Sequence, residues 1–97
     1  MIFVRKLIWN RWNIQHIARH HVAPDEVEAI CHNEPLVLTG QQKNRLVLIG
    51  TTEENRMLVV ILELKEHAAY YPITAYPANK HDVTLYNHVK GGEDNNE

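Results

Sequence analysis

Residues 35–76 contain four strand-like runs with very short connections, and this spacing restricts the fold more than any other feature of the chain. The runs are PLVLTG, RLVLIGTT, RMLVVILELK and AAYYPITAY, separated only by QQKN, EEN and EH. Parallel neighbours would need crossovers of a dozen or more residues, so the runs predict an antiparallel meander. LVVIL is apolar at every position, which predicts a central strand, whereas Pro72 predicts an edge or a bulge.

The segment after the opening run IFVRKLI, itself a predicted edge strand, has helical features. Asn10 is a good N-cap for a helix that continues towards His21. Its apolar stripe is expected to consist of Ile14, Ile17 and Ala18, and His21 is the next residue with the same helical spacing. Its polar side is expected to consist of Asn13, His16 and His20.

A second helix is predicted to begin at Pro24 and to end near Asn33. Proline fits a first turn because its missing N–H would be unpaired there, and Asp25 suits the positive end of the helix dipole. Pro35 disfavours helical angles at the residue before it. The buried stripe of this helix is expected to consist of Val27, Ile30 and Cys31.

A last helix is predicted in ANKHDVTLYNHV, with Asn79 as its N-cap. The complete order predicts one α+β domain over residues 1–90. It has an antiparallel sheet of about four strands plus the N-terminal strand, two N-terminal helices and one C-terminal helix. Residues 91–97, GGEDNNE, lack apolar side chains and are expected to form a disordered acidic tail.

Charge and composition exclude several classes of protein. The formal net charge is −2 over 97 residues, and residues 1–90 keep all 10 Lys and Arg beside nine of the 12 acids. That near-neutral balance excludes a strongly basic nucleic-acid binder, so any phosphate site must be local. No long apolar run is present, which predicts a cytoplasmic protein with no membrane contact. The single cysteine, Cys31, excludes an internal disulfide.

Five stretches, in their order and spacing, resemble the BrnT-type ribonuclease toxins, relatives of the RelE/ParE group of bacterial type II toxin–antitoxin systems. They are IWNRWN, ARHHVAPDEVEAI, NRLVLIG, NRMLVVIL and YYPITAYPANKHDVTLY. The second resembles the family pattern K-H-G-V-x-x-x-E-A, and the last resembles I-S-A-R … E-R-R-x-Y. The resemblance covers most of residues 7–89 and implies a RelE/ParE-like fold. It also implies RNA cleavage without a metal or other cofactor, by attack of the ribose 2′-OH on the adjacent phosphate.

The same resemblance implies four catalytic residues and a protein partner. Arg19 and His20 match the family's Lys-His pair, while Arg45 and Arg56 match its basic residues at the start of the second and third sheet runs. An acid/base group and cations near the phosphate are what this chemistry needs. The implied partners are RNA and a cognate antitoxin, with a homodimer or a hetero-oligomer both open.

Departures from the family pattern raise the alternative of weakened or lost activity. His21 replaces a glycine at a helix end where a left-handed conformation favours Gly or Asn. Tyr76 replaces the arginine of I-S-A-R, and Val-Thr at residues 83–84 replaces the late arginine pair. Lys80, His81 and Tyr76 are the remaining candidates for RNA contact. The alternative function is a non-catalytic protein-interaction domain of the same fold.

The candidate residues also have ordinary explanations. His16 and His20 are four residues apart and could offer nitrogens to zinc, but the third ligand would have to come from elsewhere in the fold. We therefore expect no metal site. Arg19 could be a solvated helix charge, and an exposed charge is common at the start of a strand. Trp9 and Trp12 are expected to pack in the core rather than stack on bases.

Overall fold

The elements follow one another in the predicted order. The computed structural model describes residues 4–39 and 42–94 of the 97-residue chain. Its elements are β1 (Lys6–Leu7), α1 (Arg11–Ala18), α2 (Pro24–His32), β2 (Leu36–Thr39), β3 (Arg45–Thr51), β4 (Met57–Glu66), β5 (Ala69–Pro77) and α3 (Lys80–Asp94). The predicted α+β class is confirmed, and within the described residues no helix is long and apolar enough to cross a membrane.

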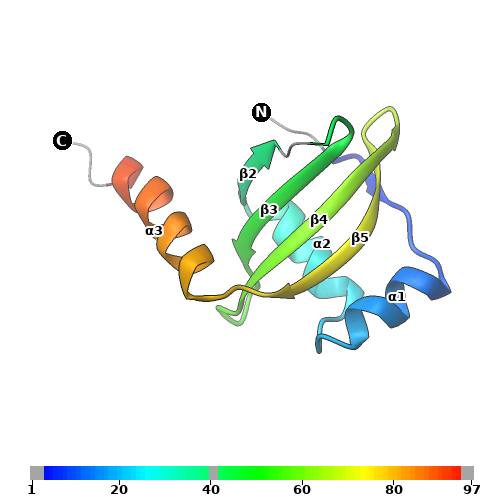
Figure 1. The fold of residues 1–97 in the computed structure, drawn as a ribbon, viewed down its shortest axis with the longest axis horizontal. Helices are drawn as coiled ribbons and strands as arrows, with labels where there is room; N and C mark the ends of the chain where they lie inside the picture. Colours follow the sequence, from blue (N-terminus) through cyan, green and yellow to red (C-terminus); the bar gives the residue numbers. More distant parts are fainter. Residues whose placement is uncertain (1–3, 40–41, 95–97) are drawn as a thin grey trace.

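The strands form one five-stranded sheet in the order β1-β5-β4-β3-β2. Strands β2 to β5 pair antiparallel with their neighbours, which confirms the meander, and β4 is the central strand, as its unbroken apolar run predicts. Strand β1 lies at the edge beside β5 and pairs with it in parallel. Figure 1 shows the long β3 and β4 in the middle of the sheet.

The proline in β5 lies beside a bulge. Ile61 pairs with Thr74 and Leu62 pairs with Pro72, so the register shifts by one residue between these two pairs. Ile73 has no opposite residue on β4. The bulge therefore accommodates a residue that cannot donate a ladder hydrogen bond, as predicted from Pro72.

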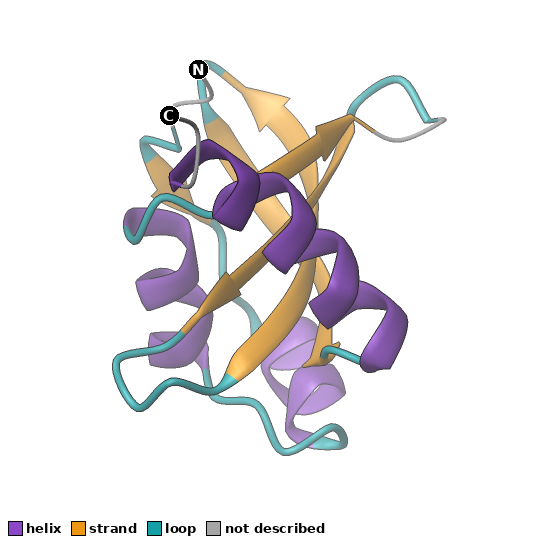
Figure 2. Ribbon diagram, turned by 90° about the vertical axis from the view of Figure 1, so that its left-hand side faces the viewer, coloured by secondary structure: helices purple, strands orange, loops and turns teal. Residues whose placement is uncertain are grey.

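Helices cover both faces of the sheet (Figure 2). On one face, Ile17 of α1 and Val27 and Ile30 of α2 pack against alternate residues of the strands, in a cluster that includes Leu48, Leu58, Val60 and Leu62. On the other face, residues of α3 pack against Leu36, Ile49 and Val59. Alternation of side chains along each strand therefore supplies two apolar surfaces, one for each helical layer.

Helix α2 approaches the sheet closely at Gly50. A Cβ atom at this position would lie 3.3 Å from Ile30 Cγ2 and 3.3 Å from Pro35 Cβ. The missing side chain thus lets α2 lie close to β3. The start at Pro24 and the end near Asn33 are confirmed. Cys31 is half-buried against the same core, so the predicted inward position of the thiol is correct although it is not fully covered.

The predicted apolar stripe of α1 is partly wrong. Ile17 is fully buried, but Ile14 is 38% exposed, Ala18 is exposed and Asn13 is only 2% exposed. The Asn13 amide donates to the Ile8 carbonyl oxygen, and its Oδ1 accepts from the Asn10 N–H. Because these bonds satisfy the amide, a polar residue can occupy the buried side of this two-turn helix.

Helix α1 ends in a Schellman motif around His21. His21 has φ 62°, its N–H donates to the Ala18 carbonyl, and the Val22 N–H donates to the Ile17 carbonyl. Val22 and Ile17 are both buried in the same core, which is the hydrophobic contact that accompanies this motif. The left-handed conformation expected at position 21 is therefore confirmed, and it turns the chain sharply from α1 into α2.

Helix α3 begins with the predicted cap. The Asp82 N–H donates to Asn79 Oδ1 and the Asn79 N–H donates to Asp82 Oδ2. The helix continues to Asp94, four residues into the segment 91–97 for which disorder was expected. Residues 95–97 of that segment lie outside the described residues.

Candidate functional site

His20 lies exposed at the end of α1 and contacts two other rings. Its ring centroid is 6.2 Å from that of Tyr76 on β5 and 5.8 Å from that of His16, both in edge-to-face geometry. The Schellman turn at His21 fixes the direction of the chain directly after His20. His20 thus joins α1 to the end of β5, while its ring remains open to solvent.

Tyr76 connects His20 with the start of α3. Partial burial and, to a smaller extent, the charge of Asp82 raise the pKa of the Tyr76 hydroxyl above its usual value. The phenol therefore stays protonated at neutral pH and can donate a hydrogen bond. Lys80 and His81 lie exposed in the first turn of α3, beside the Asp82 that acts on Tyr76.

Arg19 lies on the outward side of α1, one residue before His20. It lines a shallow hollow of about 150 Å³ together with Arg11, Trp12, Gln15 and His16. His16 belongs to this hollow and also contacts the His20 ring. The structure therefore brings Arg19, His20 and Tyr76 to one corner, linked through His16.

Arg56 was also expected at the site, but it forms an ion pair with Glu26 of α2. Its Nη1 lies 3.1 Å from both carboxylate oxygens of Glu26, and the two side chains are 34% and 22% exposed. Glu26 Oε1 also accepts a hydrogen bond from the Ala23 N–H at the start of α2. Arg56 thus ties the β3–β4 turn to α2, an ion pair that no pattern in the sequence indicated.

Arg45 lies far from the Arg56 end of β3. It opens the strand, whereas Thr51 at the other end pairs with Met57, the residue after Arg56. Six residues of extended chain span roughly 20 Å, so Arg45 and Arg56 cannot bind one phosphate. Alternation places Arg45 on the α3 face with Val47 and Ile49. The expected set of four catalytic residues is therefore divided among three places.

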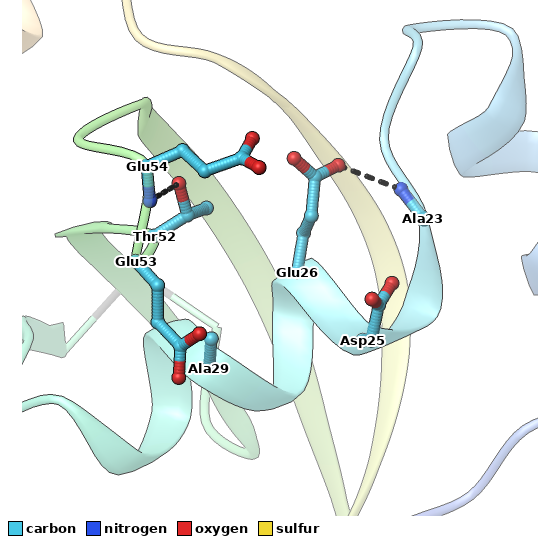
Figure 3. Close-up of a pocket in the computed structure, with 7 residues that line it drawn as sticks. All are labelled: Ala23, Asp25, Glu26, Ala29, Thr52, Glu53 and Glu54. Atoms are coloured by element: carbon cyan, nitrogen blue, oxygen red, sulfur yellow. Dashed lines mark hydrogen bonds between the residues drawn. The ribbon is translucent and has the colours of Figure 1, made fainter.

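A larger hollow, of about 380 Å³, lies between the start of α2 and the β3–β4 turn. Figure 3 shows carboxylates on both of its sides, from Asp25 and Glu26 on α2 and from Glu53 and Glu54 on the turn. Such a lining repels phosphate, so this hollow does not suit RNA despite its size. The smaller hollow on α1 has two arginines and no carboxylate among its lining residues.

The placement of the histidines does not support binding of a metal ion. Across residues 4–39 and 42–94, no group of three or more His, Cys, Asp or Glu side chains is placed to hold an ion. His16 and His20 contact each other, while His21 leaves the helix with its backbone turned. Two nearby imidazoles fall short of the three or four protein ligands of a zinc site.

Trp12 also belongs to this corner, although the sequence did not mark it as a site residue. It was expected in the core, but 74% of it is exposed. A signal was present in RWNIQHIAR: Arg11, Gln15 and Arg19 recur every four residues, as do Trp12 and His16. Residues four apart are neighbours on a helix, so both rows lie on one outward face.

No known family model matches the chain, and no curated protein matches it either. Among solved structures, the crystal structure of the Brucella abortus ribonuclease toxin BrnT is similar, with a TM-score of 0.63 and 23% sequence identity. The match covers 77% of this chain and 97% of the toxin chain. The fold that the sequence resemblance implied is thus confirmed, and the chain has the fold of the ribonuclease toxin BrnT.

Proposed function

We propose that this protein is a toxin-type RNA endonuclease that cleaves without a metal ion, with Arg19 and His20 at its centre. One observation carries the proposal. On a fold shared with a ribonuclease toxin, an exposed histidine lies next to an arginine and beside a protonated tyrosine hydroxyl. An acid/base group, a cation and a hydrogen-bond donor are what phosphodiester cleavage by an internal 2′-OH requires.

The proposed roles follow from the chemistry of each group. His20 moves the proton, because histidine alone among side chains readily takes both protonation states near neutral pH. Arg19 binds the phosphate oxygens and stabilises the charge that develops on them. Tyr76 donates from its hydroxyl, while Lys80 and His81 contact the neighbouring sugar–phosphate backbone. The 2′-OH attacks phosphorus to form a 2′,3′-cyclic phosphate while the bond to the 5′-oxygen breaks, and His20 takes the proton of the 2′-OH and delivers it to the leaving 5′-oxygen.

Weakened activity fits the arrangement of the other two arginines. Arg56 is held by Glu26, and Arg45 lies at the far end of β3. Asp82 places a negative charge close to Tyr76. With fewer cations at the phosphate, less transition-state charge is neutralised, so we propose turnover that depends chiefly on Arg19 and His20.

The test compares cleavage of total RNA, with EDTA present, by the unaltered protein and by His20→Ala and Arg19→Ala. His20→Ala should slow cleavage at saturating RNA by about 10²- to 10⁴-fold, the usual contribution of general acid–base catalysis. Arg19→Ala should weaken binding and turnover together. His88→Ala, an exposed histidine on α3, is the matched control and should cleave normally. Intact RNA with the unaltered protein, or equal cleavage by His20→Ala, contradicts the proposal.

A second candidate function is a non-catalytic interaction domain of the same fold, bound by a partner such as an antitoxin. The observation that favours it is the Arg56–Glu26 pair, which removes one cation from RNA binding. Titration with RNA at several salt concentrations separates the two functions. Phosphate contacts release counterions and make the affinity fall steeply with salt, whereas a domain without RNA affinity gives no such titration.

A further inference from the structure

The outward side of α1 has the chemistry of a single-stranded nucleic-acid surface. We define the α1 outer face as Arg11, Trp12, Gln15, His16 and Arg19, the residues that line the smaller hollow. Trp12 exposes 74% of its surface there. A large apolar ring and two arginines around the same shallow hollow offer both stacking and phosphate contacts.

Packing in the core explains the position of Trp9 but not that of Trp12. Trp9 packs against the core, and its Nε1 donates to Glu28 Oε2 at 3.0 Å. Trp12 contributes to neither core cluster and lies on the opposite side of α1 from the buried Ile17. An exposed aromatic ring of this size is typical of a binding surface.

The basic residues near the α1 outer face favour a polyanionic ligand. Residues 1–24 contain no Asp or Glu, and they hold four of the chain's 10 Lys and Arg and three of its seven histidines. The segment that contains α1 therefore carries only positive formal charges, although the whole chain carries a net charge of −2. Arg11 and Arg19 are eight residues apart, about 12 Å along the helix, and both lie in the row next to that of Trp12 and His16.

The α1 outer face is continuous with the corner that holds His20. His16 lines the hollow, its ring lies 5.8 Å from His20, and His20 lies 6.2 Å from Tyr76. A chain of rings thus leads from Trp12 to the end of β5. The acidic hollow shares no lining residue with this face, so a nucleotide strand with one phosphate at His20 can be extended along α1.

We propose that the α1 outer face is an RNA subsite in which an unpaired base stacks on Trp12 while Arg11 and Arg19 contact the flanking phosphates. The proposal rests on the proposed ribonuclease function and names the part of the protein that positions the substrate. RNA fits better than an acidic protein segment, because a flat aromatic platform matches the π-face of any base.

Binding is tested with a short single-stranded oligonucleotide carrying 2′-O-methyl groups, which lacks the attacking hydroxyl and stays intact. Trp12→Ala should weaken its binding roughly 5- to 160-fold, the range for loss of one stacked base, whereas Trp12→Phe should keep most of the affinity. Arg11→Gln should reduce the slope of log affinity against log salt by about 0.7. The charge-matched control, Lys43→Gln, alters an exposed lysine outside this face and should reduce the affinity less than Arg11→Gln.

Tryptophan fluorescence reports on the contact directly. The oligonucleotide should quench the unaltered protein, and quenching should be lost in Trp12→Phe, which keeps Trp9. Unchanged affinity in Trp12→Ala overturns the subsite. Equal affinity and equal quenching with a polyglutamate peptide also overturn it, since the face would then bind acidic protein.

Cleavage assays with the same variants separate this inference from the function on which it rests. Normal cleavage and normal binding by Trp12→Ala would refute the subsite and leave the nuclease proposal standing. Binding through Trp12 without any cleavage would support the subsite and refute the nuclease. Absence of both binding and cleavage by the unaltered protein would refute both.

Discussion

Replacing His21 with glycine should stabilise the protein, although His21 lies at the edge of the proposed site. His21 has φ 62°, a left-handed conformation that costs an L-residue about 1–2 kcal/mol. Glycine adopts it freely, but it also gives the unfolded chain extra freedom worth about 0.4–1 kcal/mol. The net gain expected for His21→Gly is about 0.5–1 kcal/mol, or about 2–8 °C in Tm for a domain of this size.

The assay is urea and thermal unfolding followed by circular dichroism, with His21→Ala as the control. Alanine removes the same exposed imidazole but keeps the backbone cost, so its stability should stay close to that of the unaltered protein. The two main-chain bonds of the motif, from His21 to Ala18 and from Val22 to Ile17, are available to all three proteins. If His21→Gly is no more stable than His21→Ala, backbone strain at this position is refuted.

Three further changes test other parts of the structure. Glu26 and Arg56 can be replaced by glutamine, singly and together, and the double-mutant cycle should give a coupling energy of about 0.5–1 kcal/mol in urea unfolding. The expected energy is modest because the ion pair is partly exposed, although Arg56 contacts both carboxylate oxygens. If the coupling energy is zero and Arg56→Gln cleaves RNA more slowly, Arg56 contacts RNA instead. Burial and, to a smaller extent, the nearby Glu28 carboxylate raise the pKa of Cys31 to about 12. Labelling of this thiol near pH 8 should therefore be about a thousandfold slower than labelling of free cysteine, and urea should restore the rate of free cysteine. The pKa of Tyr76 is raised in the folded protein, so the unfolded chain loses the phenol proton at a lower pH. The free energy of unfolding should therefore fall as the pH rises above about 10, and Tyr76→Phe should remove this part of the fall. The same dependence of the unfolding free energy on pH in both proteins would contradict the prediction.

The meander could be predicted because its connections are too short for anything else. QQKN, EEN and EH permit only antiparallel neighbours, and Pro72 marked the bulge because a missing N–H has a local consequence. The α1 stripe could be predicted only in part, since a hydrogen bond from Asn13 to the Ile8 carbonyl, directly after β1, decides which side of the helix is buried.

The site was harder to predict because its members come from separate elements. The closeness of His20 and Tyr76 depends on how α1 lies against β5, which spacing within α1 cannot show. The Arg56–Glu26 pair joins residues 30 positions apart, so a basic residue that seemed free in the sequence is bound in the fold. The expectation that Trp12 lies in the core was wrong, because its helical spacing with His16 puts it on the outward face of α1.

Strand β1 has a consequence for the order in which the protein folds. Its pairing with β5 joins residues more than 60 positions apart through the Arg5 and Lys6 N–H groups on the Ala68 carbonyl and the Ile8 N–H on the Tyr70 carbonyl. Closing so long a loop is slow compared with zipping the neighbouring strands of the meander. We expect β1 to dock after the transition state, so that Leu7→Ala accelerates unfolding more than it slows folding. The amides of β1 should then exchange with deuterium through local opening, at a lower free energy than those of β4.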